Sequence, residues 1–421
     1  MKRAQRHAGF TLVELMVAAV IFLGVSIVIF TTLANSEGQK RTTTAINDIN
    51  QEGAYVMYRL GNWLRDAGSG FAQNYLQAYG CKINAARSGT VIMPPTSLPP
   101  PFAGIVGSSS SGGGSSSGSG GSSSGGTTGY TLRLVPVIIF KNLSQSGSDI
   151  IMLMSGNGGM EQNSQPLISV PNSSSGGLSP AQSYTIKTGD LLLLSDLWSG
   201  SNMSDCLLEQ VNATGYTAGS TPIPISSSTY YYAGPSGKSL TSYSVNGAVT
   251  NIGSSTSTTT NWPNFTLIGV GPSASSAQNN SLYAYDLLQN GGATTSVTVA
   301  DNVLEMHALY GLDSGNRGVV DQWVDPSSSG YTAANLLDGT LTARQKLCMI
   351  KAIRVGIIMR TDISDKTDVG QPNTITLFSD LGSSLTYTYT LTSGTTKTYR
   401  YRAMETTIPL RNNYLIGNPC Q

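Results

Sequence analysis

Gly9-Phe10-Thr11-Leu12-Val13-Glu14 separates a basic leader from a long apolar run. The leader carries Lys2, Arg3 and Arg6, and the 22 residues from Leu15 to Ser36 carry no charge. A membrane-spanning helix needs about 20 predominantly apolar residues, so this run is long enough for one span. Because the basic residues precede it, we expect the leader to stay on the cytoplasmic side of the membrane and the chain after about Asn35 to be exported.

An amphipathic pattern continues this apolar run. Apolar or small residues recur at alternating spacings of three and four, namely Ile46, Ile49, Gly53, Val56, Leu60 and Trp63 or Leu64. No proline interrupts Phe10 to Gly68. The pattern predicts one helix of about 59 residues and about 90 Å. We expect its first half to lie in lipid or a fibre core, and its second half to pack one face on a globular domain.

An ordinary secretory signal, cleaved near Thr32-Leu33-Ala34, is the alternative interpretation. Two features disfavour it. A carboxylate inside an apolar helix is costly and usually functional, so Glu14 would be pointless in a discarded signal. The helical pattern also continues well beyond the apolar run.

The N-terminal region resembles the class III signal of type IV pilins and of type II secretion pseudopilins. The resemblance implies that a prepilin peptidase cleaves after Gly9, that Phe10 becomes the methylated N-terminus, and that Glu14 directs docking into a filament. In a dry helical bundle a lone carboxylate attracts a cation, and the amino terminus of a neighbouring chain is the nearest candidate. We expect a leader at 1–9, a transmembrane and assembly helix at 10–35, and its amphipathic continuation at 36–69.

Composition indicates a polar but weakly charged exported chain. Charged residues make up 11% of the sequence, whereas glycine occurs 48 times. Removal of the three basic leader residues leaves 21 of the 24 Lys and Arg residues. With 23 acidic residues, the net charge is then −2. This balance excludes a basic footprint for nucleic acid.

The segment from Gly107 to Gly126 reads GSSSSGGGSSSGSGGSSSGG, which cannot bury a core. We expect a disordered surface insertion, 107–129, within one head domain, 70–421. A linker between two domains is the alternative, but the segment before it is short and rich in proline.

The head contains short runs rich in Val, Ile, Leu and Tyr that predict strands. They are Tyr130–Phe140, Asp149–Met154, Asp190–Ser195, Cys206–Val211, Val303–Tyr310, Ile350–Met359 and Tyr399–Leu410. Thr342-Ala-Arg-Gln345 has a capping-box pattern and predicts a short helix to about Met349. The predicted fold class is α+β, with the long N-terminal helix packed on a mostly antiparallel, β-rich head.

The four cysteines are Cys81, Cys206, Cys348 and Cys420. Their spacing matches no metal-binding pattern, and export favours two disulfides in one of three connectivities. We favour Cys81 with Cys206 and Cys348 with Cys420, since a terminal cysteine can tie down a loose end.

A metal site and a catalytic site are both disfavoured. The segment Asp313 to Asp321, with Asn316, resembles the Asp/Asn/Gly-rich turn of related pilins, but Gly315 and Val324 fall where an EF-hand loop needs oxygen ligands. We therefore expect a strand-joining turn, with weak calcium binding as the alternative, and no cofactor.

His307 is the histidine left after the leader, which contains His7, is removed. It shares a strand face with Glu305, and the sequence has neither a Gly-x-Ser-x-Gly elbow nor a phosphate-binding loop. We expect a half-buried structural histidine and a protein that is not an enzyme.

Four head segments resemble blocks of the PilW-type minor pilins: 190–196 before Cys206, 303–313, 350–360 and 401–412. Residues 212–298 match no family that we recognise. The resemblance implies a minor pilin that initiates assembly or caps the tip. Its expected partners are the prepilin peptidase/methylase, other minor and major pilins, and the inner-membrane assembly machinery. We expect a single-pass inner-membrane protein with a periplasmic head that later reaches the pilus surface.

Three other functions stay open from the sequence. A minor pseudopilin of type II secretion shares the signal and the helix. A tip adhesin would use the long polar insertions. An exported hydrolase is the third, and the scarcity of histidine disfavours it.

Overall fold

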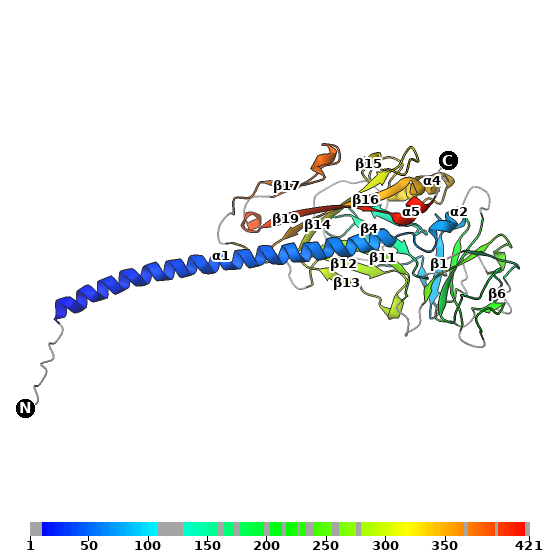
Figure 1. Cartoon of the computed structure of the whole chain (residues 1–421), viewed down its shortest axis with the longest axis horizontal. Helices are drawn as coiled ribbons and strands as arrows, with labels where there is room; N and C mark the ends of the chain where they lie inside the picture. The colour runs from blue at the N-terminus through cyan, green and yellow to red at the C-terminus, as the bar shows by residue number, and fades with distance from the viewer. Residues whose placement is uncertain are drawn as a thin grey trace, which may run out of the picture.

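A single helix, α1 (Leu12–Asp66), projects from a β-rich head in the computed structural model (Figure 1). The structure describes residues 11–107, 129–158, 164–171, 177–197, 203–212, 216–225, 228–232, 240–254, 261–274, 279–365, 369–391 and 395–416. The helix has 55 residues and ends close to where the amphipathic pattern stops. The α+β prediction of a long helix on a mostly antiparallel head is confirmed.

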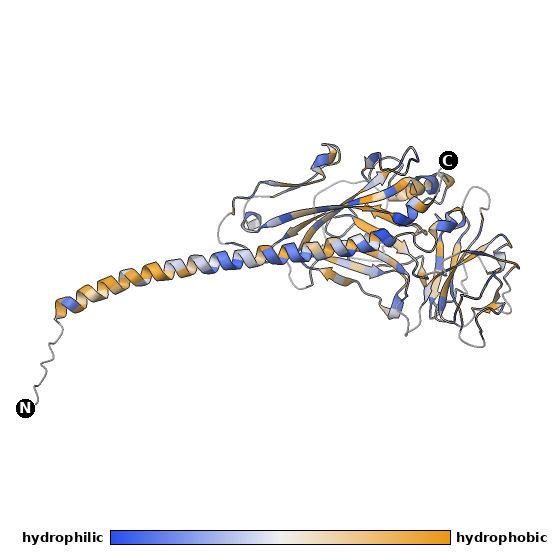
Figure 2. Ribbon diagram, viewed as in Figure 1, coloured by the Kyte–Doolittle hydropathy of each residue, from blue (hydrophilic) through white to orange (hydrophobic). Residues whose placement is uncertain are grey.

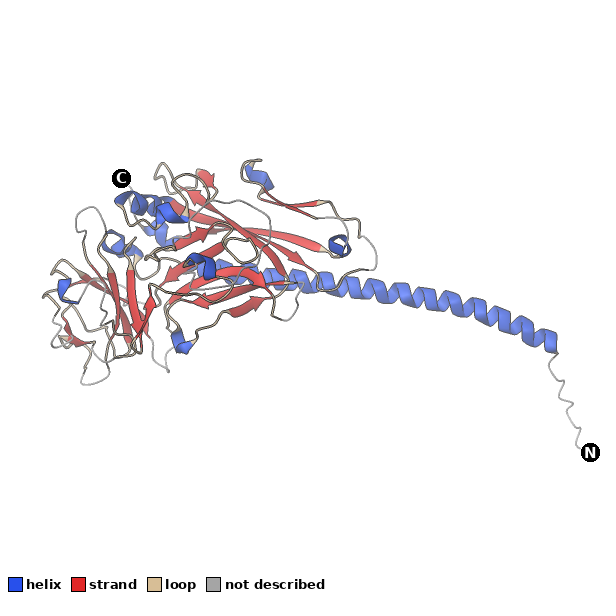
Figure 3. Cartoon of the chain, turned by 180° about the vertical axis from the view of Figure 1, so that it is seen from behind, coloured by secondary structure: helices blue, strands red, loops and turns tan. Residues whose placement is uncertain are grey.

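Three main sheets form the described part of the head, as Figure 3 shows from behind. The distal sheet has the order β2 (Thr90–Met93), β1 (Ile83–Arg87), β8 (Cys206–Gln210), β7 (Asp190–Ser195), β10 (Ala248–Ser254), β5 (Gln165–Pro166). The central sheet has the order β13 (Val297–Ala300), β12 (Asn280–Asp286), β11 (Asn264–Pro272), β4 (Ile150–Ser155), β3 (Val137–Phe140). The helix-side sheet has the order β15 (Gln322–Val324), β14 (Val303–Leu312), β16 (Ile350–Arg360), β19 (Tyr401–Pro409).

Smaller elements complete the head. Two short pairs are β17 (Thr374–Leu377) with β18 (Tyr387–Thr390), and β6 (Gly177–Leu178) with β9 (Ile223–Pro224). The short helices are α2 (Tyr75–Ala78), α3 (Ala333–Leu336), α4 (Leu341–Met349) and α5 (Arg411–Leu415). Among the ladders of the described residues, β1 and β8 pair in parallel and the others are antiparallel.

The C-terminal half of α1 lies against the helix-side and central sheets, where it contacts β19, β16, β13 and β4 (Figure 1). Ile49, Val56, Leu60 and Leu64 on its predicted stripe are buried in a core shared with both sheets. Gly53 allows a close approach, because a Cβ there would overlap the ends of the Met359 and Met404 side chains. The stripe therefore fastens the helix to the head.

Each of the seven predicted strand runs contains a strand, but the first is much shorter than predicted. In the run 130–140, only Val137–Phe140 forms β3. Pro136 precedes it and has no N–H to donate to a ladder. Strands β10, β11 and β12 were not predicted, because Asn, Asp, Ser, Thr or Gly occupies at least three positions of each strand.

The predicted capping box at Thr342–Gln345 is wrong. Helix α4 ends at Met349 as predicted, but its N-cap is Thr340, whose hydroxyl accepts the Ala343 N–H at 3.2 Å. Asp338 accepts the N–H and hydroxyl of Thr340, each at 2.7 Å, and so fixes the start of the helix two residues earlier. Thr342 therefore lies inside the helix.

The predicted insertion, 107–129, lies outside the described residues except for its two ends. The Tyr130 N–H donates to the Ile105 carbonyl at 2.8 Å, so the chain leaves and re-enters the head at one place. The domain boundaries stay a prediction.

Candidate functional site: the projecting helix

The first half of α1 projects from the head, and the hydropathy colouring of Figure 2 shows that this half is mostly apolar. Its large apolar side chains are exposed. Leu12 and Phe22 are 75% and 73% exposed, values that only a lipid or protein partner would reduce. Within the described residues this is the one helix long and apolar enough to cross a membrane. The segment is thus a surface that the chain itself leaves uncovered.

The hydroxyl groups in this half bond to the helix itself. Ser26 donates to the Phe22 carbonyl at 2.8 Å, and Thr31 and Thr32 each donate to the Val28 carbonyl, at 2.9 and 3.0 Å. In hydrocarbon every polar group needs a partner of this kind. These residues therefore place no unsatisfied hydroxyl on the apolar surface.

Glu14 closes the N-terminal end of the helix in a capping box with Thr11. Its carboxylate accepts the Thr11 N–H at 3.0 Å and the Thr11 hydroxyl at 2.9 Å, while that hydroxyl accepts the Glu14 N–H at 3.3 Å. This capping role was not predicted, although the Thr-x-x-Glu spacing of a capping box is present at Thr11 to Glu14. Gly9 and Phe10 lie outside the described residues, so the predicted cleavage and methylation stay predictions.

The far end of α1 is held by the C-terminal segment of the chain. The side-chain amide of Asn412 donates to the carbonyls of Asp66 and Ala67, at 3.2 and 3.0 Å. The last carbonyls of a helix lack partners within the helix, so this amide supplies some of the bonds they need. Asn412 ends the fourth segment of the family resemblance, but the sequence indicated no role for it.

Part way along the helix, Glu52 joins α1 to the central sheet. Its carboxylate accepts the Asp301 N–H at 3.0 Å. Burial raises the pKa of Glu52 above its ordinary value, against the opposing effect of this hydrogen bond. This hydrogen bond adds a polar contact between α1 and the head beside the apolar stripe.

One of the two predicted disulfides is present. Cys81 and Cys206, both fully buried, are joined and close a segment with a sequence separation of 125. They lie where β1 begins to pair with β8, so the bond ties the chain after α1 to the distal sheet. Cys348 is buried in α4, and Cys420 lies outside the described residues, so their pairing stays a prediction.

The segment from Asp313 to Asp321 forms the predicted turn, which joins β14 to β15. The Asp313 carboxylate accepts the N–H groups of Arg317 and Gly318 at 2.8 and 2.6 Å. The Asp321 carboxylate accepts the Ser314 N–H at 3.1 Å and faces the Arg317 guanidinium at 3.1 Å. Hydrogen bonds led by the one from Ser314 lower the pKa of Asp321 to about 2.

This turn supplies its own hydrogen-bond donors to both carboxylates. Asn316 takes the left-handed conformation that the turn requires, with φ of 51°. Among the described residues, no cluster of three or more His, Cys, Asp or Glu side chains could hold a metal ion. Weak metal binding at Asp313, Asn316 and Asp321 stays untested.

His307 is fully buried, at 1% exposure, rather than half-buried as predicted. Its Nε2 lies 3.1 Å from the Glu305 carboxylate, and its Nδ1 lies 3.4 Å from that of Asp149. Tyr387 covers the ring, with the two ring centroids 3.7 Å apart. Burial alone would lower the pKa of His307, but the interactions with Asp149 and Glu305 outweigh it and raise the pKa.

These contacts explain why His307 is fully buried, which was not predicted from the sequence. Asp149 ends a loop before β4 and accepts the Ala308 N–H at 3.0 Å, which brings a distant carboxylate under β14. Because both ring nitrogens face carboxylates, the histidine is poorly placed to act as a base on a nucleophile.

A basic leader, a projecting apolar helix and a β-rich head define the class of pilin-like proteins. Two comparisons with protein families agree with this class. Residues 4–23 match the prokaryotic N-terminal methylation motif, and residues 270–412 match the type IV pilus-assembly protein W family. Together they support a PilW-type minor pilin. No curated protein and no solved structure matches the chain significantly.

The PilW match covers the whole helix-side sheet, on which α1 packs. It spans the segment from the end of β11 to the start of α5, which includes β16, β19 and Asn412. Every strand of the distal sheet precedes the matched segment. The matched families are structural components of pili rather than enzymes, and the motif with its apolar helix indicates membrane anchoring and pilus assembly.

Proposed function

We propose that this chain is a minor type IV pilin, without enzymatic activity, that initiates pilus assembly or caps the pilus tip. The observation that supports this proposal most is the contrast within α1. Its first half exposes apolar side chains all around, whereas its second half is fastened to the head by a buried stripe. The apolar half of such a helix can leave the lipid and pack against similar helices of other subunits. The buried stripe keeps the head attached during this transfer.

The proposed path has four steps. The chain inserts as a single-pass inner-membrane protein with its head in the periplasm. The prepilin peptidase cleaves after Gly9 and methylates Phe10. The helix then associates with those of other minor and major pilins at the inner-membrane assembly machinery, with Glu14 paired to the amino terminus of a neighbour.

The distal sheet favours a terminal position in the filament. It lies at the end of the head opposite the projecting half of α1 (Figure 1). A subunit stacked beyond it would have to accommodate this additional lobe, so we place the chain at the tip.

Substitutions at the first turn separate docking from helix capping. Glu14→Gln removes the charge but leaves an oxygen that can still accept the Thr11 N–H, whereas Thr11→Ala removes the cap and leaves the charge. In a deletion strain complemented by each variant, we expect normal processing throughout. Glu14→Gln should be lost from sheared pili, and Thr11→Ala should be retained. Equal incorporation of Glu14→Gln and wild type would contradict a charged docking role.

The deletion strain itself tests initiation. We expect few or no surface pili, counted by electron microscopy, and their recovery with the wild-type chain. Normal number and length of pili would exclude a priming role. A secretion defect with intact pili would identify a minor pseudopilin of type II secretion instead.

A further inference from the structure

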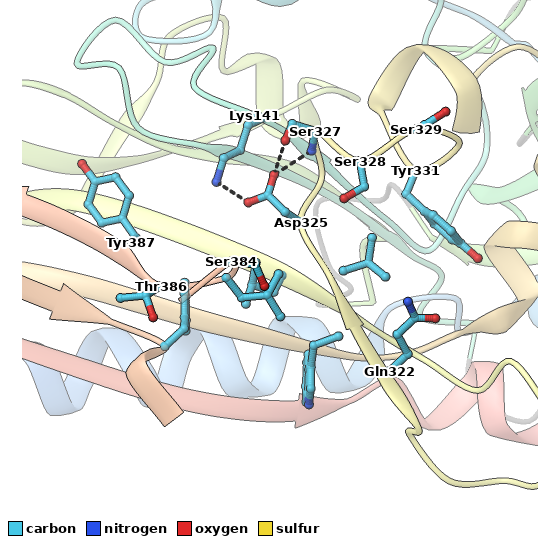
Figure 4. A pocket seen from close by; sticks show the side chains of 15 residues that line it. Lys141, Gln322, Asp325, Ser327, Ser328, Ser329, Tyr331, Ser384, Thr386 and Tyr387 are labelled. Carbon is cyan, nitrogen blue, oxygen red and sulfur yellow. Dashed lines mark hydrogen bonds and ion pairs between the residues drawn. The ribbon is translucent and has the colours of Figure 1, made fainter. Parts of the chain in front are cut away.

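A hollow of about 580 Å³ opens on the helix-side sheet, beneath the β17–β18 hairpin (Figure 4). β15 and the loop after it line one part, and residues 384–387 of the hairpin line another. Its volume falls within the range of about 300–1,000 Å³ that is usual for small-molecule sites. The proposed filament contacts of α1 do not involve this hollow, so it is available for a separate role.

Aromatic rings provide flat apolar surfaces in the hollow. Trp323, Tyr331 and Tyr387 line it and are each partly exposed. In Figure 4, Tyr331 and Tyr387 lie at opposite ends of the group of side chains. Trp323 packs against Gly311, where an added Cβ would lie 2.9 Å from the indole ring. Rings held in this way present large contact surfaces at a low cost in conformational entropy.

Polar side chains stand beside these rings with unused hydrogen-bonding groups. In the described part of the chain, no hydrogen bond within the protein engages the side chains of Gln322, Ser328 or Ser384, all of which line the hollow. An amide and two hydroxyls offer donors as well as acceptors. A purely apolar ligand would leave these groups without partners on binding, which is unfavourable.

The charges of the lining cancel. Among the described residues around the hollow, Lys141 and Asp325 are the charged ones, and they pair with each other at 3.1 Å (Figure 4). Asp325 also accepts the N–H and hydroxyl of Ser327, at 2.8 and 2.6 Å. The hollow therefore has no excess positive charge to attract a phosphate, a sulfate or a sialic acid.

We propose that this hollow binds a neutral saccharide. A sugar ring has an apolar C–H face for the aromatic rings and hydroxyl groups for Gln322 and the serines. Its lack of charge suits the paired Lys141 and Asp325. The site lies on the head, away from the apolar half of α1, where an external ligand can reach it when that half is in lipid or a filament.

Binding can be tested with the full-length chain in detergent on an array of immobilised neutral, sulfated and sialylated oligosaccharides. We expect saturable binding to at least one neutral oligosaccharide. Trp323→Ala and, independently, Gln322→Ala should weaken this binding at least about tenfold, a change typical of losing a single well-placed contact. Trp262→Ala is the matched control, because Trp262 is a partly exposed tryptophan outside the hollow.

Gln322→Ala guards against misfolding, since Gln322 is exposed and its loss leaves no buried cavity. An absence of neutral-sugar binding would overturn the proposal, as would binding restricted to sulfated or sialylated sugars. Binding that Trp323→Ala and Gln322→Ala leave unchanged would also overturn it. Pilus assembly by the Gln322→Ala chain reports on the proposed function separately.

Discussion

Replacing Cys81 and Cys206 together by alanine should markedly destabilise the head. The bond closes a segment with a sequence separation of 125, for which the chain-entropy relation gives about 5 kcal/mol. Natural disulfides usually contribute about 2–5 kcal/mol, so we expect the upper part of that range. Alanine is preferred to serine, because both positions are fully buried and a hydroxyl there would lack a partner.

The assay is urea unfolding of the full chain in detergent, followed by circular dichroism. The double variant should unfold at a lower urea concentration than the wild type. A reductant should lower the wild-type midpoint in the same direction. Any response to reductant that remains in the double variant would report a second disulfide, which Cys348→Ala should then abolish.

A shared midpoint of the double variant and the wild type under oxidising conditions would contradict a stabilising role of this disulfide. Cys81 and Cys206 found as thiols by mass spectrometry, in protein isolated from the cell envelope, would contradict the disulfide itself. Either result would mean that β-sheet pairing alone holds the start of β1 to β8.

Three further predictions concern the helix and the buried histidine. Leu60→Ala should lower the free energy of unfolding by about 2–5 kcal/mol, as for other buried leucines, whereas exposed Tyr58→Ala should change it by less than about 0.5 kcal/mol in the same urea titration. Asn412→Ala should cost about 1 kcal/mol and speed amide exchange at the end of α1, because carbonyls there lose their donor; unchanged exchange would contradict the role of this cap. The raised pKa of His307 means that its charged form stabilises the head below the unfolded-state pKa of about 6.5, and that this contribution is lost as the pH rises through the folded-state pKa. The urea midpoint should therefore fall as pH increases above about 6.5, and His307→Gln should flatten this dependence; an equally steep profile in His307→Gln would exclude His307 as its source.

The helix was the most predictable part of this chain. Its apolar residues recur at helical spacing within one continuous segment. The apolar run and the stripe from Ile49 to Leu64 therefore predict both halves of the helix from local sequence alone. The strongest strands were also legible, because β7 and β16 consist largely of Leu, Ile and Val. Local sequence was therefore sufficient to predict elements that have one continuous apolar face or that consist mainly of apolar side chains.

Long-range contacts escaped the sequence reading. Asp149 reaches His307 across 158 positions, and Asn412 reaches the end of α1 across more than 340. Neither pair leaves a local pattern. The hollow under the hairpin is lined by residues from four separate segments of the chain, so its composition could not be predicted before the pairing of the strands was known.

Polar strands were hidden for a different reason. β10 and β12 carry the buried polar side chains of Asn251, Ser254 and Ser281, each of which donates a hydrogen bond. Asn251, for example, donates to the Asp190 carboxylate at 2.9 Å. A search for apolar alternation passes over such strands.

Mass spectrometry of the N-terminal peptide, from the native membrane and from sheared pili, decides whether this subunit is processed and assembled as a pilin. We expect a mature chain that begins at methylated Phe10 and retains Glu14 in both fractions. An N-terminus near Ala34 would contradict it, because cleavage there would remove the helix half through which we propose that this subunit assembles.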